Sequence, residues 1–74
     1  MRLNVKLFAY FRDNRFVAEV QDYPDTITVG EIVDGLSIDR DEIGITMLNS
    51  RHCGFDAVPA EGDILAIFPV IGGG

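Results

Sequence analysis

The chain has 74 residues, a formal net charge of −6 and a hydrophobic content of 47%. A chain of this length forms one domain, and its single cysteine cannot pair within the chain, so burial of apolar side chains must supply nearly all of the stability. Little material remains for an internal active-site cavity. No apolar run approaches the roughly 20 residues that a membrane span needs, and no hydrophobic leader is visible, so we expect a cytoplasmic protein that does not bind membranes.

Charge is distributed unevenly along the sequence. Residues 1–15 carry four basic side chains and one acidic side chain, whereas residues 16–74 carry eleven acidic side chains against two arginines. An acidic domain repels the phosphate backbone of nucleic acids, so we expect no nucleic-acid partner. The acidic excess favours a basic partner surface or serves solubility alone.

Alternating apolar residues predict a first strand over residues 2–8, in which Leu3, Val5 and Leu7 share one face. Residues 16–20 are rich in strand-forming side chains and predict a second strand. A polar turn lies between the two, which favours an antiparallel hairpin.

The clearest helix signal begins at Thr28. Thr28 and Glu31 have the spacing of a capping box, and an apolar stripe at helical spacing then predicts a short helix over residues 29–36. Gly35 marks either the fraying end of this helix or a close approach to the sheet.

Strands dominate the second half of the sequence. Residues 45–48 predict a strand that ends in a turn, and residues 51–55 predict a short strand or an extended connection. The nearly continuous apolar run over residues 64–68 predicts a central strand that is covered on both faces. This order of elements predicts the α+β class, with a mixed sheet and one main helix packed across it. We assign residues 1–69 to a single domain and residues 70–74 to a flexible C-terminal tail.

His52 and Cys53 are the obvious reactive pair in the sequence. Adjacent residues in an extended segment point to opposite faces, which is a poor arrangement for a catalytic dyad. A structural zinc site needs about four Cys or His ligands, and the acidic residues Asp39, Asp41 and Glu42 lack the spacing of a calcium loop. We therefore expect no metal site and interpret these residues as ordinary loop, core or solvated positions.

The C-terminal segment offers a different kind of chemistry. Gly72, Gly73 and Gly74 carry no side chains and can enter a narrow tunnel, and Val70 and Ile71 precede them as apolar anchors. The terminal carboxylate is ionised at neutral pH and is a poor electrophile, so acyl chemistry there requires activation by a nucleotide-using partner. The alternative is an inert terminus or a remnant of cloning.

Several motifs resemble the ubiquitin-like sulfur-carrier family typified by MoaD and ThiS. Residues 28–32 (TVGEI) resemble the T-V-x-x-L opening of the family's helix, and residues 48–49 (LN) resemble the end of its third long strand. The C-terminal part of the family's sequence pattern, G-D-x-[VI]…F-P-x-V…G-G, is similar to residues 61–64 (EGDI), residues 67–70 (IFPV) and the terminal Gly-Gly. The match in pattern and order covers essentially the whole chain.

This resemblance implies a β-grasp fold and a carrier rather than an enzyme, with no stably bound cofactor. An ATP-using, ubiquitin-activating-type enzyme would adenylate the carboxylate of Gly74. A persulfide sulfur from a cysteine desulfurase or a similar donor would convert it to a thiocarboxylate, and a partner synthase would take the sulfur into a cofactor. By motif position, Gly73 and Gly74 inherit the role of the reactive tail. The segment that enters the partner corresponds to Phe68, Pro69, Val70, Ile71 and Gly72.

Two features of the sequence favour different recipients of the sulfur. The Phe68-Pro69 pair resembles the small subunit of molybdopterin synthase, although a second proline often stands in that subunit where this chain has Val70. The short hairpin around Asp13, without the extra helical turn of longer members, resembles the thiamine thiazole branch. We favour molybdopterin synthesis. The alternatives are thiazole synthesis, a protein modifier joined through Gly74 to lysines of its targets, and a β-grasp binding module with an inert tail.

Overall fold

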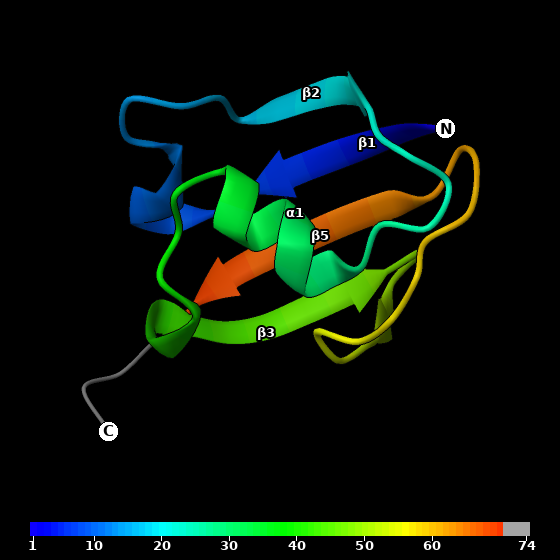
Figure 1. Ribbon diagram of the computed structural model, residues 1–74. Coiled ribbons are helices and arrows are strands. Elements are labelled where there is room, and N and C mark those ends of the chain that lie inside the picture. Colours follow the sequence, from blue (N-terminus) through cyan, green and yellow to red (C-terminus); the bar gives the residue numbers. More distant parts are fainter. Residues whose placement is uncertain (71–74) are drawn as a thin grey trace.

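The computed structural model describes residues 1–70, which form a five-stranded mixed sheet with one α-helix lying across it (Figure 1). The strands are β1 (Arg2–Leu7), β2 (Ala18–Asp22), β3 (Ile43–Leu48), β4 (Arg51–His52) and β5 (Ile64–Pro69). The helix is α1 (Val29–Gly35), and two short 3₁₀ helices, η1 (Ala9–Arg12) and η2 (Arg40–Glu42), lie in the connections.

The strand order is β2-β1-β5-β3-β4, so the last strand lies at the centre of the sheet. Strand β5 runs parallel to β1 and antiparallel to β3, and β1 pairs with β2 in an antiparallel hairpin. The predicted α+β class, the mixed sheet and the single main helix are confirmed, and together they give the β-grasp arrangement.

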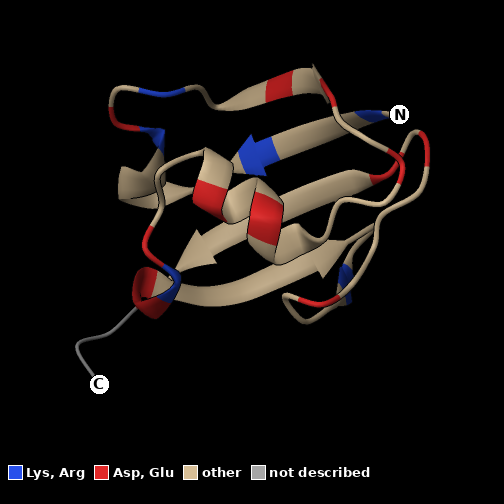
Figure 2. Ribbon diagram, in the orientation of Figure 1, with Lys and Arg blue, Asp and Glu red and all other residues tan. Residues whose placement is uncertain are grey.

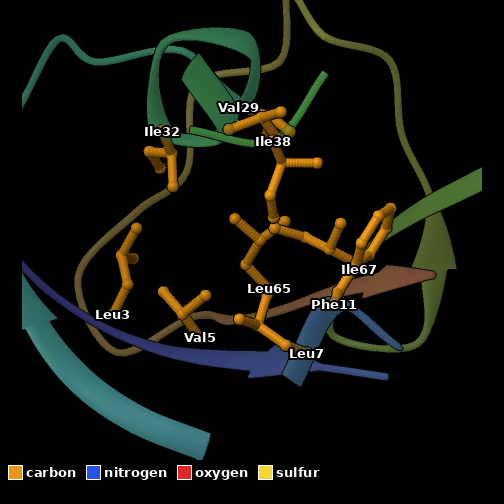
Figure 3. Packing of buried hydrophobic residues seen from close by; sticks show 10 residues of the cluster. Leu3, Val5, Leu7, Phe11, Val29, Ile32, Ile38, Leu65 and Ile67 are labelled. Carbon is orange, nitrogen blue, oxygen red and sulfur yellow. The ribbon is translucent and has the colours of Figure 1, made fainter. Parts of the chain in front are cut away.

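Helix α1 covers one face of the sheet, and the core fills the space between them (Figure 3). Alternate residues of β1 and β5 point towards the helix and are fully buried, as the period of two in a strand requires. The buried cluster consists of Leu3, Val5, Leu7, Phe11, Val29, Ile32, Val33, Ile38, Leu65 and Ile67.

The capping box at the start of α1 is confirmed. The Glu31 amide donates to Thr28 Oγ1 at 3.1 Å, and the Thr28 amide donates to Glu31 Oε1 at 3.0 Å. A Cβ atom on Gly35 would meet no atom within 4 Å, so this glycine marks the end of the helix and not a close approach to the sheet. Beyond the helix, the Arg15 guanidinium donates to the carbonyl oxygens of Leu36 and Ser37 at 3.0 and 3.1 Å.

The first hairpin differs from its prediction. Ala9 adopts φ +53° and turns the chain into η1, and Arg12 Nε donates to the Leu7 carbonyl at 2.8 Å. Because η1 and a following turn occupy this stretch, regular pairing resumes only at Ala18, opposite Lys6. The second strand therefore lies at 18–22 instead of 16–20, and the expectation of a hairpin without a helical turn was wrong.

The hairpin of β3 and β4 turns on two residues with positive φ, Asn49 at +52° and Ser50 at +68°. Both values belong to a type I′ turn, whose twist matches that of the flanking strands. Strand β3 begins at Ile43, two residues before the predicted start, and β4 is only two residues long.

Strand β5 is central, as predicted, but it is not covered on both faces. Leu65, Ile67 and Pro69 are buried, whereas Ile64 is exposed and Ala66 and Phe68 are half-buried. The single helical layer covers one face of the sheet, and nothing in residues 1–70 forms a second layer over the other. The expectation of two covered faces was therefore wrong.

Candidate docking face and root of the C-terminal tail

No helix within residues 1–70 covers the sheet face opposite α1, and we call this face the open face. Strand register sets its rows, because side chains directly opposite one another point to the same side. One row joins Val20, Asn4 and Ile64, and the next joins Ala18, Lys6, Ala66 and Met47. A third row brings Phe8 and Ile45 to either side of Phe68.

Apolar side chains dominate this face although solvent reaches it. The exposed fractions are 61% for Val20, 40% for Ile45 and 39% for Ile64. Scattered apolar residues are normal on a protein surface, but a contiguous group of them marks an interaction site. The open face is therefore the candidate surface for a partner protein.

Two aromatic rings form the end of the open face nearest the tail. The rings of Phe8 and Phe68 stack with their centroids 4.1 Å apart and their planes at 15°. The Arg12 Cζ atom lies 5.5 Å from the centroid of the Phe8 ring, on its face, as in a cation–π contact. Phe68, predicted from the sequence to bind a partner, thus belongs to a prebuilt aromatic platform.

The root of the tail is held against β3. The Val70 amide donates to the Glu42 carbonyl at 2.9 Å, one step beyond the pairing of Ile43 with Pro69. The register shifts between Ile43 and Ile45, so Gly44 sits in a bulge. A Cβ atom on Gly44 would lie 2.9 Å from the Pro69 carbonyl oxygen, so this close approach requires glycine.

Alternation along β5 separates the predicted partner residues. Phe68 lies on the open face, and Val70, which is 47% exposed, follows it on the same side, whereas Pro69 is buried towards the helix. The remaining predicted residues of the tail lie outside the described part of the chain. They are Ile71, Gly72, Gly73 and Gly74.

The two 3₁₀ helices meet beside this root. Partial burial, together with the neighbouring carboxylate of Glu42, raises the pKa of the Tyr10 hydroxyl. Tyr10 belongs to η1 and Glu42 to η2, so η1 lies beside the residue whose carbonyl holds Val70. Four residues of this region were not predicted from the sequence: Tyr10, Phe8, Lys6 and Ile45. Alternation places the last three away from the core, but only the register shows that they join Phe68.

Charge differs between the two sides of the sheet (Figure 2). Acidic residues lie on β2, α1 and η2 and in the loops, whereas β3 and β5 carry no charged residue at all. The net charge of −6 is therefore not a property of the open face.

His52 and Cys53 lie on opposite sides of the chain, as expected. His52 is paired with Met47 of the open face, whereas Cys53 packs against the core with its Sγ atom 3.6 Å from Thr46 Oγ1. Both line a shallow hollow of about 210 Å³ beside β3. Residues 1–70 contain no group of three His, Cys, Asp or Glu side chains that could hold a metal ion.

No helix formed by residues 1–70 is long and apolar enough to cross a membrane. The longest helix, α1, has seven residues.

The mixed sheet with a central C-terminal strand and one covering helix defines a ubiquitin-like β-grasp protein. The sequence matches the model of the ThiS family over residues 5–74, and the chain therefore belongs to the ThiS family, which confirms the resemblance to the MoaD and ThiS sulfur carriers. It has no significant match among proteins of curated function.

Solved structures share this fold at low sequence identity. A crystal structure of SAMP1 from Haloferax volcanii is 24% identical, with all of both chains covered and a TM-score of 0.76. A putative molybdopterin converting factor, subunit 1, from Pyrococcus furiosus is 21% identical over 96% of this chain and 99% of its own, with a TM-score of 0.78. The solution structure of the HVO 2177 protein of Haloferax volcanii is 24% identical over 100% of this chain and 87% of its own, with a TM-score of 0.77.

Proposed function

We propose that this chain is a sulfur carrier that displays the carboxylate of Gly74 to an activating enzyme and then to a cofactor synthase. The observation that carries the proposal is the continuity between the open face and the tail. Strand β5 supplies Phe68 to the half-buried aromatic platform and leads directly into Val70 and the terminal glycines. A partner docked on the open face therefore receives the tail from a fixed point.

The chemistry follows from the weak electrophilicity of a carboxylate. The Gly74 carboxylate attacks the α-phosphorus of ATP in the activating enzyme, an acyl adenylate forms and pyrophosphate leaves. A persulfide sulfur then attacks the acyl carbon, AMP leaves, and a thiol cleaves the resulting S–S bond to give the thiocarboxylate. The carrier contributes positioning alone, so it acts as a subunit and not as an enzyme.

We favour molybdopterin synthesis as the destination of the sulfur. The Phe68-Pro69 pair supports this choice. Because the first hairpin contains the 3₁₀ helix η1, the absence of a helical turn no longer favours the thiazole branch. The Pyrococcus furiosus protein described as a molybdopterin converting factor subunit shares the fold over nearly its whole length. Thiazole synthesis is the alternative that the family match supports.

Docking depends on the aromatic platform. Truncation of Phe68 to Ala removes the stacked partner of Phe8 from the open face, and an aromatic anchor that becomes buried in an interface is worth about 2 kcal/mol or more. We expect roughly a 30-fold loss of affinity for the activating enzyme, measured by calorimetry. Val58→Ala is the control, because Val58 is 53% exposed but lies in the loop before Pro59, outside the open face.

Intact-mass spectrometry of the chain purified from its native host tests the function. A mass gain equal to the replacement of one oxygen by sulfur at the C-terminus supports the carrier. Deletion of Gly74 should abolish this gain and leave thermal unfolding unchanged. If the chain gains neither sulfur nor any adduct in the presence of ATP and its activating enzyme, the proposal is wrong.

A protein modifier is the second candidate. The observation that favours it is the whole-chain structural similarity to SAMP1, which is described as a small archaeal modifier protein. Both functions pass through the same adenylate and differ in the nucleophile, which is sulfur in the carrier and a lysine amine in the modifier. Lysines of host proteins that carry the C-terminal tryptic peptide of this chain, residues 52–74, joined through Gly74 would favour the modifier if they are found without a thiocarboxylate.

A further inference from the structure

Lys6 occupies the centre of the open face. In the strand register it lies between Ala18 of β2 and Ala66 of β5, and the next residue in the row is Met47. The side chain is half-buried although it carries an ammonium group at neutral pH. A cation therefore stands within a surface that is otherwise largely apolar.

No carboxylate of the described chain neutralises this cation. The ion pairs within residues 1–70 join the Met1 amino group to Asp25, Arg2 to Asp22 and Arg40 to Asp34. Asp22 lies opposite Arg2 at the corner of the open face and is engaged with it at 3.6 Å. Glu19 of β2 lies opposite Val5, whose side chain points to the helix side, and neither β5, the other neighbour of β1, nor β3 beyond it contributes an acidic residue (Figure 2).

A partner that covers the open face must accommodate the ammonium of Lys6. Burial of a charge without a counter-charge is strongly unfavourable, because the group loses its water and gains no compensating interaction. We propose that the partner docked on the open face places a carboxylate opposite Lys6. This inference rests on the proposed function and specifies the chemistry of the docking surface.

The proposal reverses, for this one face, the expectation drawn from the net charge. An overall charge of −6 favours a basic partner, but the acidic residues lie mainly on α1, on η2 and in the loops, and Asp22 of β2, the one at the corner of the open face, is engaged with Arg2. The partner therefore presents a carboxylate to the sheet, whatever basic groups it carries elsewhere. Arg12 does not substitute for Lys6, because it already covers the Phe8 ring and donates to the Leu7 carbonyl.

Affinity measurements with the purified adenylating enzyme of the same organism test this pairing. Lys6→Met keeps the length of the side chain and removes its charge, and we expect affinity to fall about tenfold or more, because the facing carboxylate is left unpaired. Arg51→Met is the matched control. It also removes one exposed positive charge. Arg51 is paired with Leu48, whose side chain packs against the core, so Arg51 lies on the helix side of the sheet and not on the open face. Equal losses from the two variants overturn the proposal.

Cross-linking identifies the carboxylate directly. Lys6 is the only lysine of the chain. A carbodiimide joins amines to carboxylates without a spacer, so few amines of this chain can form an amide bond with a partner carboxylate. Peptide mapping of the cross-linked complex should locate an amide between Lys6 and one Asp or Glu of the partner. A complex that forms and transfers sulfur without this cross-link overturns the inference and leaves the proposed function intact. Failure of the unmodified chain to bind the enzyme overturns both.

Discussion

A methyl group added at Gly44 should loosen the root of the tail. In Gly44→Ala the new Cβ atom would lie 2.9 Å from the Pro69 carbonyl oxygen and 3.1 Å from the Val70 Cα atom. Both are backbone atoms, so neither can rotate away as the end of a side chain could. The strands β3 and β5 must separate at the bulge, and the Val70 amide must move from the Glu42 carbonyl.

The expected cost is the balance of three effects. Overpacking typically costs about 1–3 kcal/mol, and the loss of one hydrogen bond costs about 0.5–1.5 kcal/mol. Replacement of glycine restricts the unfolded chain and recovers about 0.4–1 kcal/mol. We therefore expect the free energy of unfolding to fall by about 2 kcal/mol, which lowers the melting temperature by roughly 8–16 °C in a domain of this size.

Urea unfolding followed by circular dichroism measures the stability, and amide hydrogen exchange of Val70 reports on the root of the tail. Gly35→Ala is the control, since its Cβ atom meets nothing within 4 Å and should stabilise the helix by up to about 1 kcal/mol. The rate at which the activating enzyme adenylates Gly44→Ala should fall by a larger factor than the affinity of this variant for the enzyme. If Gly44→Ala is as stable as Gly35→Ala and the Val70 amide remains protected, the steric reasoning is wrong.

Three further predictions concern local interactions. Thr28→Ala removes the helix cap and should lower the free energy of unfolding by about 1 kcal/mol in urea. In Gly30→Ala the new Cβ atom would lie 2.5 Å from Arg40 Nη2, so the guanidinium must shift away from Asp34, and the gain in helix propensity of about 1 kcal/mol should be smaller than when Arg40 is also replaced by Ala, as a double-mutant cycle can show. Hydrogen bonds from the Ala60 amide and the Asn49 side chain hold the pKa of Asp63 below its usual 3.8. The stabilisation is present above pH 3.8 and is lost as the pH falls through the lowered pKa, so the melting temperature of Asp63→Asn should fall less on acidification.

Local signals predicted the elements whose causes are local. The alternation in β1 and the Thr28 capping box each depend on a few neighbouring residues, and both were found where the sequence placed them. Helix η1 escaped prediction because it starts from a positive φ at Ala9, a conformation that alanine rarely adopts. Its position is fixed by contacts with the rest of the chain, such as the hydrogen bond from Arg12 to the Leu7 carbonyl.

The error over β5 is informative about function. A continuous apolar run over residues 64–68 indicates a strand covered on both faces, yet one helix covers only one of them. The second set of apolar side chains, including Ile64 and Phe68, has no partner layer within residues 1–70. The same pattern thus arises when another protein supplies the second layer, and a single sequence does not distinguish the two cases.

The place of β5 in the sheet also fixes when a docking surface first exists. The strand pairs with β1, from the beginning of the chain, and with β3, and it contributes Leu65 and Ile67 to the core. During synthesis the sheet cannot close until residue 69 has been made. The aromatic platform and the held root of the tail therefore arise together with the fold, and an activating enzyme that recognises them also selects chains that have been synthesised through β5 and have folded.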